Sequence, residues 1–412
     1  MAAPPRRKST RPIRKYRDWS SLPEELLECI GKMLPSPREA AKFRSICPAW
    51  CAALPFAKYI APVLMLPDPD SPDGAINFYT PGDGGESSFT RNLPSLRGKR
   101  LCGSSGGWLA LVDEAVSVTL LNPLTGATVE LPPADERVVA ASFRHVMTPD
   151  GIPSAMLLME SGHYAFVRVD DMKKRAFRQI VLSSSSSPGS GECVAMAALA
   201  DSGTVAFCRV GVDRAWTLLE TNLPAGPVTS VVHFRGSTFL AISDGGRAGG
   251  PGGISICDVG GAVPTATRIQ GLHAAPKLTT YARSHLQVNG VLYVVATVSE
   301  DSTFLSHVYE CNVMAAEPRW TRVTNTTNNG LTFFMSTNLS DFTAGYGGAP
   351  SVSTFKTNSV YCAKPALRRR RHRRVELEII DIAHGTSELV QPCDNTIHDS
   401  GPLCWIQPNH WA

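Results

Sequence analysis

Residues 107–133, GWLALVDEAVSVTLLNPLTGATVELPP, decide the fold class of this chain. Three runs, Trp108 to Val112, Val116 to Leu121 and Ala127 to Leu131, are rich in the residue types of β-strands. Asp113-Glu114 and the segment from Asn122 to Gly126 separate them with residues typical of turns. The stretch therefore predicts an antiparallel meander of three strands.

Similar triplets of β-type runs recur beyond residue 60. They start near residues 62, 154, 193, 228, 284 and 331, a spacing of roughly 35 to 56 residues that suits a four-stranded propeller blade. We therefore predict a β-propeller of six or seven blades over residues 60–412. Trp405 and Trp411 are expected to close the ring, with Cys404-Trp405-Ile406 joining the first blade. The alternative is a pair of β-sandwiches, which needs similar turns but no repeat.

The segment before this β-rich body, residues 18–58, has a helical period instead. Apolar side chains recur at steps of three, four and one, which places them on one stripe of a helix: Leu22, Leu26, Leu27, Ile30, Met33 and Leu34. Ser21 and Glu24 form a capping-box pattern, so we expect the helix to begin near Ser21. Forty residues cannot bury much core by themselves, and this segment therefore needs a partner surface.

The same segment resembles an F-box, in which Leu-Pro, paired leucines and an isoleucine precede an arginine, an aliphatic residue, Cys and Trp. The matching residues here are Leu22-Pro23, Leu26-Leu27, Ile30, Arg44, Ile46, Cys47 and Trp50. F-boxes bind the Skp-type adaptor of Skp–cullin–F-box ubiquitin ligases. The resemblance therefore implies an adaptor-binding surface made of Leu22, Pro23, Leu26, Leu27, Ile30, Leu34, Ile46 and Trp50. The alternative is that these residues form only the private core of a small helical domain.

A second resemblance covers most of the chain. GSSGGWLALVDE and LLNPLTGATVELPP, followed by HLQVNGVLYVVA, RWTRV, TNSVYCA and PLCWIQP, are similar to a family of plant F-box proteins. The C-terminal module of that family is called domain of unknown function 295, or the KIB-type β-propeller. The resemblance implies a substrate-recruiting receptor without saying which substrate it recruits.

Positive charge is concentrated in two short arrays. Residues 1–17 hold seven Lys or Arg and no acid, and a second array holds six arginines, Arg368, Arg369, Arg370, Arg371, Arg373 and Arg374. Without these thirteen cations, the formal net charge of +4 becomes −9. Isolated arrays argue against a nucleic-acid-binding face, which would spread basic residues among aromatic ones. We interpret residues 1–17 as a disordered tail and the arrays as candidate nuclear-localisation signals or solvated runs, for a protein of the nucleus, the cytoplasm or both.

Local motifs for catalysis or metal binding are weak. Gly103-Ser104-Ser105-Gly106-Gly107 matches GxSxG, but a β-type run follows it where a hydrolase would have a helix. We therefore expect a tight turn with glycines at positive φ. The ten histidines and eleven cysteines show no HExxH or CxxC spacing, so we predict no catalytic residue, no metal and no cofactor. No apolar run reaches eighteen residues and the N-terminus has no apolar h-region, so neither a membrane nor secretion is expected.

These features together predict an α+β multidomain chain, with a small N-terminal all-α F-box followed by an all-β propeller. The expected function is the substrate-recognition subunit of a Skp–cullin–F-box ubiquitin ligase, in which the F-box docks the Skp-type adaptor and cullin core and the propeller binds a protein target. Two alternatives remain: a protein-interaction scaffold without degradation, and a propeller enzyme with groups converging in the central channel.

Overall fold

The computed structural model divides the chain into two compact units, Met1–Pro55 and Phe56–Ala412. The residues it describes are 19, 22–34, 42–53, 62–67, 75–81, 87–143, 145–147, 153–158, 164–168, 173–183, 191–224, 226–245, 252–275, 280–300, 303–324, 331–337, 343–348, 355–365, 373–390, 396–397 and 403–407. The smaller unit is helical and the larger one is built of β-sheet.

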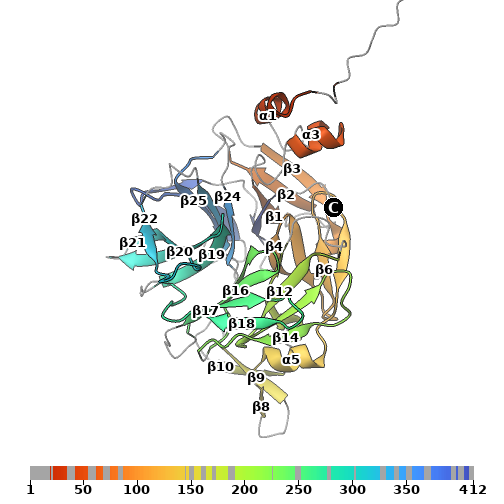
Figure 1. The fold of residues 1–412 in the computed structure, drawn as a ribbon, viewed down its shortest axis with the longest axis vertical. Coiled ribbons are helices and arrows are strands. Elements are labelled where there is room, and N and C mark those ends of the chain that lie inside the picture. Colours follow the sequence, from red (N-terminus) through yellow and green to blue (C-terminus); the bar gives the residue numbers. More distant parts are fainter. Residues whose placement is uncertain are drawn as a thin grey trace, which may run out of the picture. The chain divides into compact units, whose positions relative to one another are not determined.

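Six sheets of the larger unit are the blades of a β-propeller (Figure 1). From the inner to the outer strand, blade 1 is β29 (Cys404–Ile406), β1 (Val63–Pro67), β2 (Ala75–Thr80) and β3 (Ser87–Asn92). Blade 2 is β4 (Arg100–Ser105), β5 (Trp108–Val112), β6 (Val118–Leu121) and β7 (Thr128–Leu131). Blade 3 is β11 (Phe177–Leu182), β12 (Val194–Leu199), β13 (Thr204–Arg209) and β14 (Thr217–Glu220).

The other three blades complete the series. Blade 4 is β15 (Ser230–Arg235), β16 (Thr238–Ser243), β17 (Gly253–Asp258) and β18 (Thr265–Arg268). Blade 5 is β19 (Thr280–Val288), β20 (Val291–Glu300), β21 (Thr303–Cys311) and β22 (Thr321–Val323). Blade 6 is β24 (Thr343–Gly348), β23 (Thr332–Thr337), β25 (Ser359–Pro365), β26 (Arg373–Asp381) and β27 (Ser387–Val390), with β23 parallel to β25 and β28 (Thr396–Ile397) paired to β26.

The inner strands close the ring. β29 lies beside β4, β4 beside β11, β11 beside β15, β15 beside β19, β19 beside β24, and β24 beside β29. The predicted closure by Cys404-Trp405-Ile406 is confirmed, because Leu64 of β1 pairs with Trp405 of β29, whereas Trp411 lies outside the described residues. The indole N–H of Trp405 also donates to the carbonyl oxygen of Met335 at 2.9 Å, which links blades 1 and 6. The propeller is therefore correct, with six blades, and the two-sandwich alternative is wrong.

Within the described residues, six apolar clusters of the core lie one between each pair of neighbouring blades, and a smaller cluster holds Val139, Phe143 and Ala176. Successive side chains of a strand point to opposite faces, so one strand serves two clusters. In β5, Trp108 and Ala110 face blade 3, while Leu109 and Leu111 face blade 1. Inner and middle strands must therefore be apolar on both faces, which explains unbroken runs such as WLALV.

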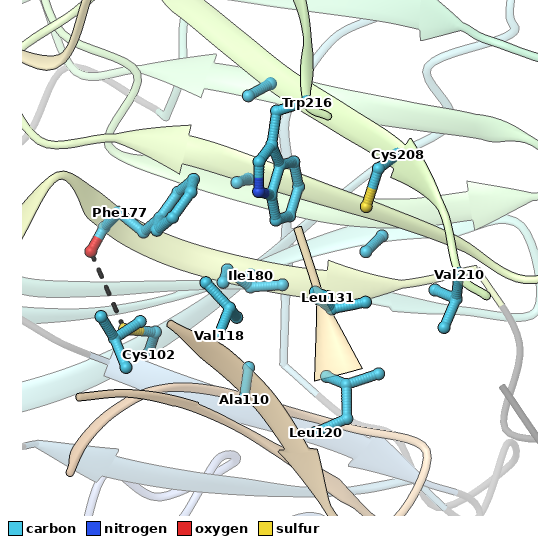
Figure 2. Packing of buried hydrophobic residues seen from close by; sticks show 14 of the residues in the cluster. Cys102, Ala110, Val118, Leu120, Leu131, Phe177, Ile180, Cys208, Val210 and Trp216 are labelled. Atoms are coloured by element: carbon cyan, nitrogen blue, oxygen red, sulfur yellow. Dashed lines mark hydrogen bonds between the residues drawn. The ribbon is translucent and has the colours of Figure 1, made fainter. Parts of the chain in front are cut away.

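Figure 2 shows the cluster between blades 2 and 3. Trp216, which comes just before β14, is 2% exposed and its ring centroid lies 4.9 Å from that of Phe177. Its indole N–H donates to the carbonyl oxygen of Pro132 at 2.6 Å, directly after β7. Trp320, just before β22 of blade 5, makes the corresponding bond at 2.9 Å to the carbonyl oxygen of His273, which follows β18 of blade 4. Each of these two tryptophans therefore joins the start of an outer strand to the preceding blade by a hydrogen bond.

One predicted triplet is not a blade. The strands traced from residue 154 belong to a separate three-stranded sheet of β8 (His145–Met147), β9 (Pro153–Leu158) and β10 (Tyr164–Arg168). In Figure 1 it lies at the bottom of the view, near α5 (Glu136–Ser142). Since β4 and β11 already touch, the ring has no gap there for a seventh blade. The triplet is an insertion between blades 2 and 3.

The N-terminal unit contains α1 (Glu24–Lys32) and α3 (Pro48–Ala53). The predicted start near Ser21 is about three residues early, because α1 begins at Glu24 after Pro23 with no side-chain cap; Ser21 itself lies outside the described residues. Glu24 and Glu25 occupy its first turn, where their charges favour the helix dipole. Residues 1–17, the predicted basic tail, lie outside the described residues.

Candidate functional site

The N-terminal unit has a small aromatic core. Leu27, Phe43, Trp50 and Ala53 are all buried there, and the rings of Phe43 and Trp50 lie 4.5 Å apart. The indole N–H of Trp50 donates to the carbonyl oxygen of Trp19 at 2.9 Å, which holds the segment before α1 against α3. This core is small for an independent domain.

Arg44 is the charged residue of this core and is 9% exposed. Its guanidinium donates to the Sγ of Cys51 at 3.2 Å. Burial lowers the pKa of Arg44, and the contact with Cys51 opposes that shift. The buried guanidinium of Arg44 links the segment before α3 to Cys51 of α3. Breaking this contact would leave a buried charge without its partner, which is unfavourable.

Among its described residues, the same unit exposes four large apolar side chains to solvent. They are Met33 (75% exposed), Trp19 (59%), Ile46 (54%) and Leu26 (51%). Exposed apolar residues that occur singly are ordinary, but four in a unit of this size are typical of a binding surface. The described part of the unit therefore has as many buried core residues as large exposed apolar ones, four of each.

The eight predicted adaptor-binding residues divide by burial. Leu26, Ile46 and Pro23 are exposed, and Leu22, Ile30 and Leu34 are half-buried. Leu27 and Trp50 are buried, at 1% and 9%. Their docking role stays a prediction, with the exposed residues free to make contacts and the buried ones supporting them. The sequence reasoning did not select Trp19 or Met33, although Met33 belongs to the helical stripe that it described.

The GxSxG segment joins three blades instead of forming a nucleophile elbow. Gly106 and Gly107 make the two-residue turn between β4 and β5, with φ of +57° and +87°. The hydroxyl of Ser105 donates to the carbonyl oxygen of Leu182 at 3.3 Å and accepts from the same residue's N–H at 3.2 Å. Ser104 donates to the carbonyl oxygen of Trp405 at 3.3 Å. Both hydroxyls therefore satisfy backbone groups of neighbouring inner strands.

The buried cysteines have the properties of core residues. Burial raises the pKa of Cys102 to about 11 and that of Cys404 to about 12, so both remain thiols near neutral pH. His285 lies in an inner strand, where its Nε2 is 3.1 Å from the carbonyl oxygen of Ala274. Within the described residues no group of three His, Cys, Asp or Glu side chains is placed to hold a metal ion.

The second basic array is described only at its end. Arg373 and Arg374 begin β26 and pair with β28, whereas Arg368, Arg369, Arg370 and Arg371 lie outside the described residues. The nuclear-localisation role of all six stays a prediction. Among the described residues no helix is both long and apolar enough to cross a membrane.

Comparison with known proteins supports both resemblances. The chain is 29% identical over 244 residues to the F-box protein SKIP23 of Arabidopsis thaliana, covering 56% of this chain and 54% of that protein. It is 28% identical over 160 residues to the Arabidopsis thaliana F-box only protein 7, covering 35% and 36%. The chain thus spans about half the length of the first relative and less of the second. A solved prolyl endopeptidase structure is 12% identical in sequence, and the match covers 90% of this chain and 53% of the endopeptidase chain. Its TM-score of 0.29 is too low to establish a shared fold.

The profile of the KIB1-4 beta-propeller matches residues 78–384, which run from β2 of blade 1 to the turn after β26 of blade 6. This match covers most of the six-bladed ring. The chain therefore belongs to the KIB1-4 beta-propeller family.

Proposed function

We propose that this protein is the substrate-recognition subunit of a Skp–cullin–F-box ubiquitin ligase. In this proposal the N-terminal unit is an F-box that docks a Skp-type adaptor, and the propeller holds a protein target. The exposed apolar side chains of the N-terminal unit carry the proposal, because a small helical unit that exposes them gains stability from a partner. The relatives named as F-box proteins support it.

The mechanism requires no covalent chemistry from this chain. Another subunit would carry the activated ubiquitin, and this protein would raise the local concentration of a target lysine near it. The rigid ring suits that task, because six interlocked blades fix the positions of the loops that would hold the target. The apolar anchors of the adaptor contact would be the exposed residues Leu26, Ile46 and Pro23.

Leu26 and Leu27 provide a matched pair of variants for testing the adaptor contact. They are neighbours of the same type, yet their side chains are 51% and 1% exposed. We expect Leu26→Ala combined with Ile46→Ala to reduce capture of a purified Skp-type adaptor at least tenfold, as loss of central apolar anchors does, while unfolding is unchanged. Leu27→Ala should instead destabilise the helical unit by about 2–5 kcal/mol, as buried leucines do.

Leu389→Ala is the control, because Leu389 is 55% exposed on β27 of the propeller and should have no effect on adaptor capture. Undiminished capture by the Leu26→Ala, Ile46→Ala double variant would refute the adaptor contact. Reconstitution with adaptor and cullin then separates a ligase subunit from a scaffold. A ligase subunit supports ubiquitination of a co-purified partner, and a scaffold binds the adaptor without it.

A further inference from the structure

We draw no further inference here: the strongest candidate, the face of α1 that exposes Leu26, Cys29 and Met33 at helical spacing, belongs to the adaptor-binding surface already proposed, and nothing in the structure shows a further partner that covers it.

Discussion

Gly103 is the position where the smallest side-chain addition should have the largest effect on the ring. It lies in β4 at a bulge, and an added Cβ would overlap the backbone carbonyl oxygen of Ile180 in β11. The carbonyl carbon and the amide nitrogen of Ile180 would each be 3.3 Å away. Because both sides of this contact are backbone, Gly103→Ala can be accommodated only if the two inner strands separate, by about 1 Å given an optimal spacing near 3.5 Å.

That separation would break the bonds that join β4 to β11. The guanidinium of Arg100 donates to the carbonyl oxygen of Phe177 at 2.6 Å, and Ser105 makes two bonds of 3.2 and 3.3 Å to Leu182. Losing two or three such bonds at about 1 kcal/mol each, together with about 1–3 kcal/mol of overpacking strain, gives a loss of about 3–6 kcal/mol. This is a large fraction of an ordinary folding free energy of about 5–15 kcal/mol.

Urea unfolding followed by tryptophan fluorescence measures this effect, since Trp216 and Trp405 are buried in the propeller. With an m-value near 3 kcal/mol/M, we expect the midpoint of Gly103→Ala to fall by roughly 1–2 M. Gly261→Ala is the matched control, because its new Cβ would meet the carbonyl oxygen of Val263 at an ordinary 3.7 Å. Equal midpoints for the two variants would refute the close approach of β4 and β11.

Three further outcomes follow from the described contacts. Trp405→Phe retains an aromatic ring but removes the indole N–H, so unfolding should be easier by about 1–3 kcal/mol in the same urea assay; an unchanged midpoint would contradict the closure bond. Iodoacetamide at pH 8 should label the exposed Cys29 of the native chain and leave Cys404 unlabelled, because burial raises the pKa of Cys404 to about 12; mass spectrometry of the labelled peptides decides this. Asp135 caps α5 by accepting from the N–H of Val138 at 2.9 Å. Partial burial raises the pKa of Asp135, but the hydrogen bonds from Val138 and Arg137 and the charge of Arg137 lower it below the ordinary 3.8. Its stabilisation should therefore be present above pH 4 and lost as the pH falls through the lowered pKa, and Asp135→Ala should cost about 1 kcal/mol at pH 7 but less at pH 3 by thermal unfolding.

Strands and turns were largely predictable from local sequence. The three strands of residues 107–133 were placed within two residues, because alternation of apolar runs and turn residues is a local property. Ring closure by Cys404-Trp405-Ile406 was also predicted, although that pairing is remote in sequence. The blade count could not be read, since the insertion of β8, β9 and β10 has the same pattern of strands as a blade.

The candidate sites show the same division. The helical stripe predicted which residues of the N-terminal unit matter, but two adjacent leucines of that stripe have opposite exposure, and periodicity alone does not separate them. The glycines of GxSxG were expected to supply positive φ, which holds for Gly106 and Gly107. Gly103 has a different role, close backbone approach to a strand of the next blade, and no local signal reports that.

Sequence alone determined that this chain has a short amphipathic helical segment and a long series of β-meanders. Those features depend on the order of neighbouring side chains, which the sequence contains directly. The tertiary structure decided that six sheets form the ring, which strand faces serve which pair of blades, and that Gly103 lies against the backbone of Ile180. Each of these depends on contacts between residues far apart in the chain. Local sequence patterns are compatible with several arrangements of the strands, and the packing of one blade against the next selects one of them.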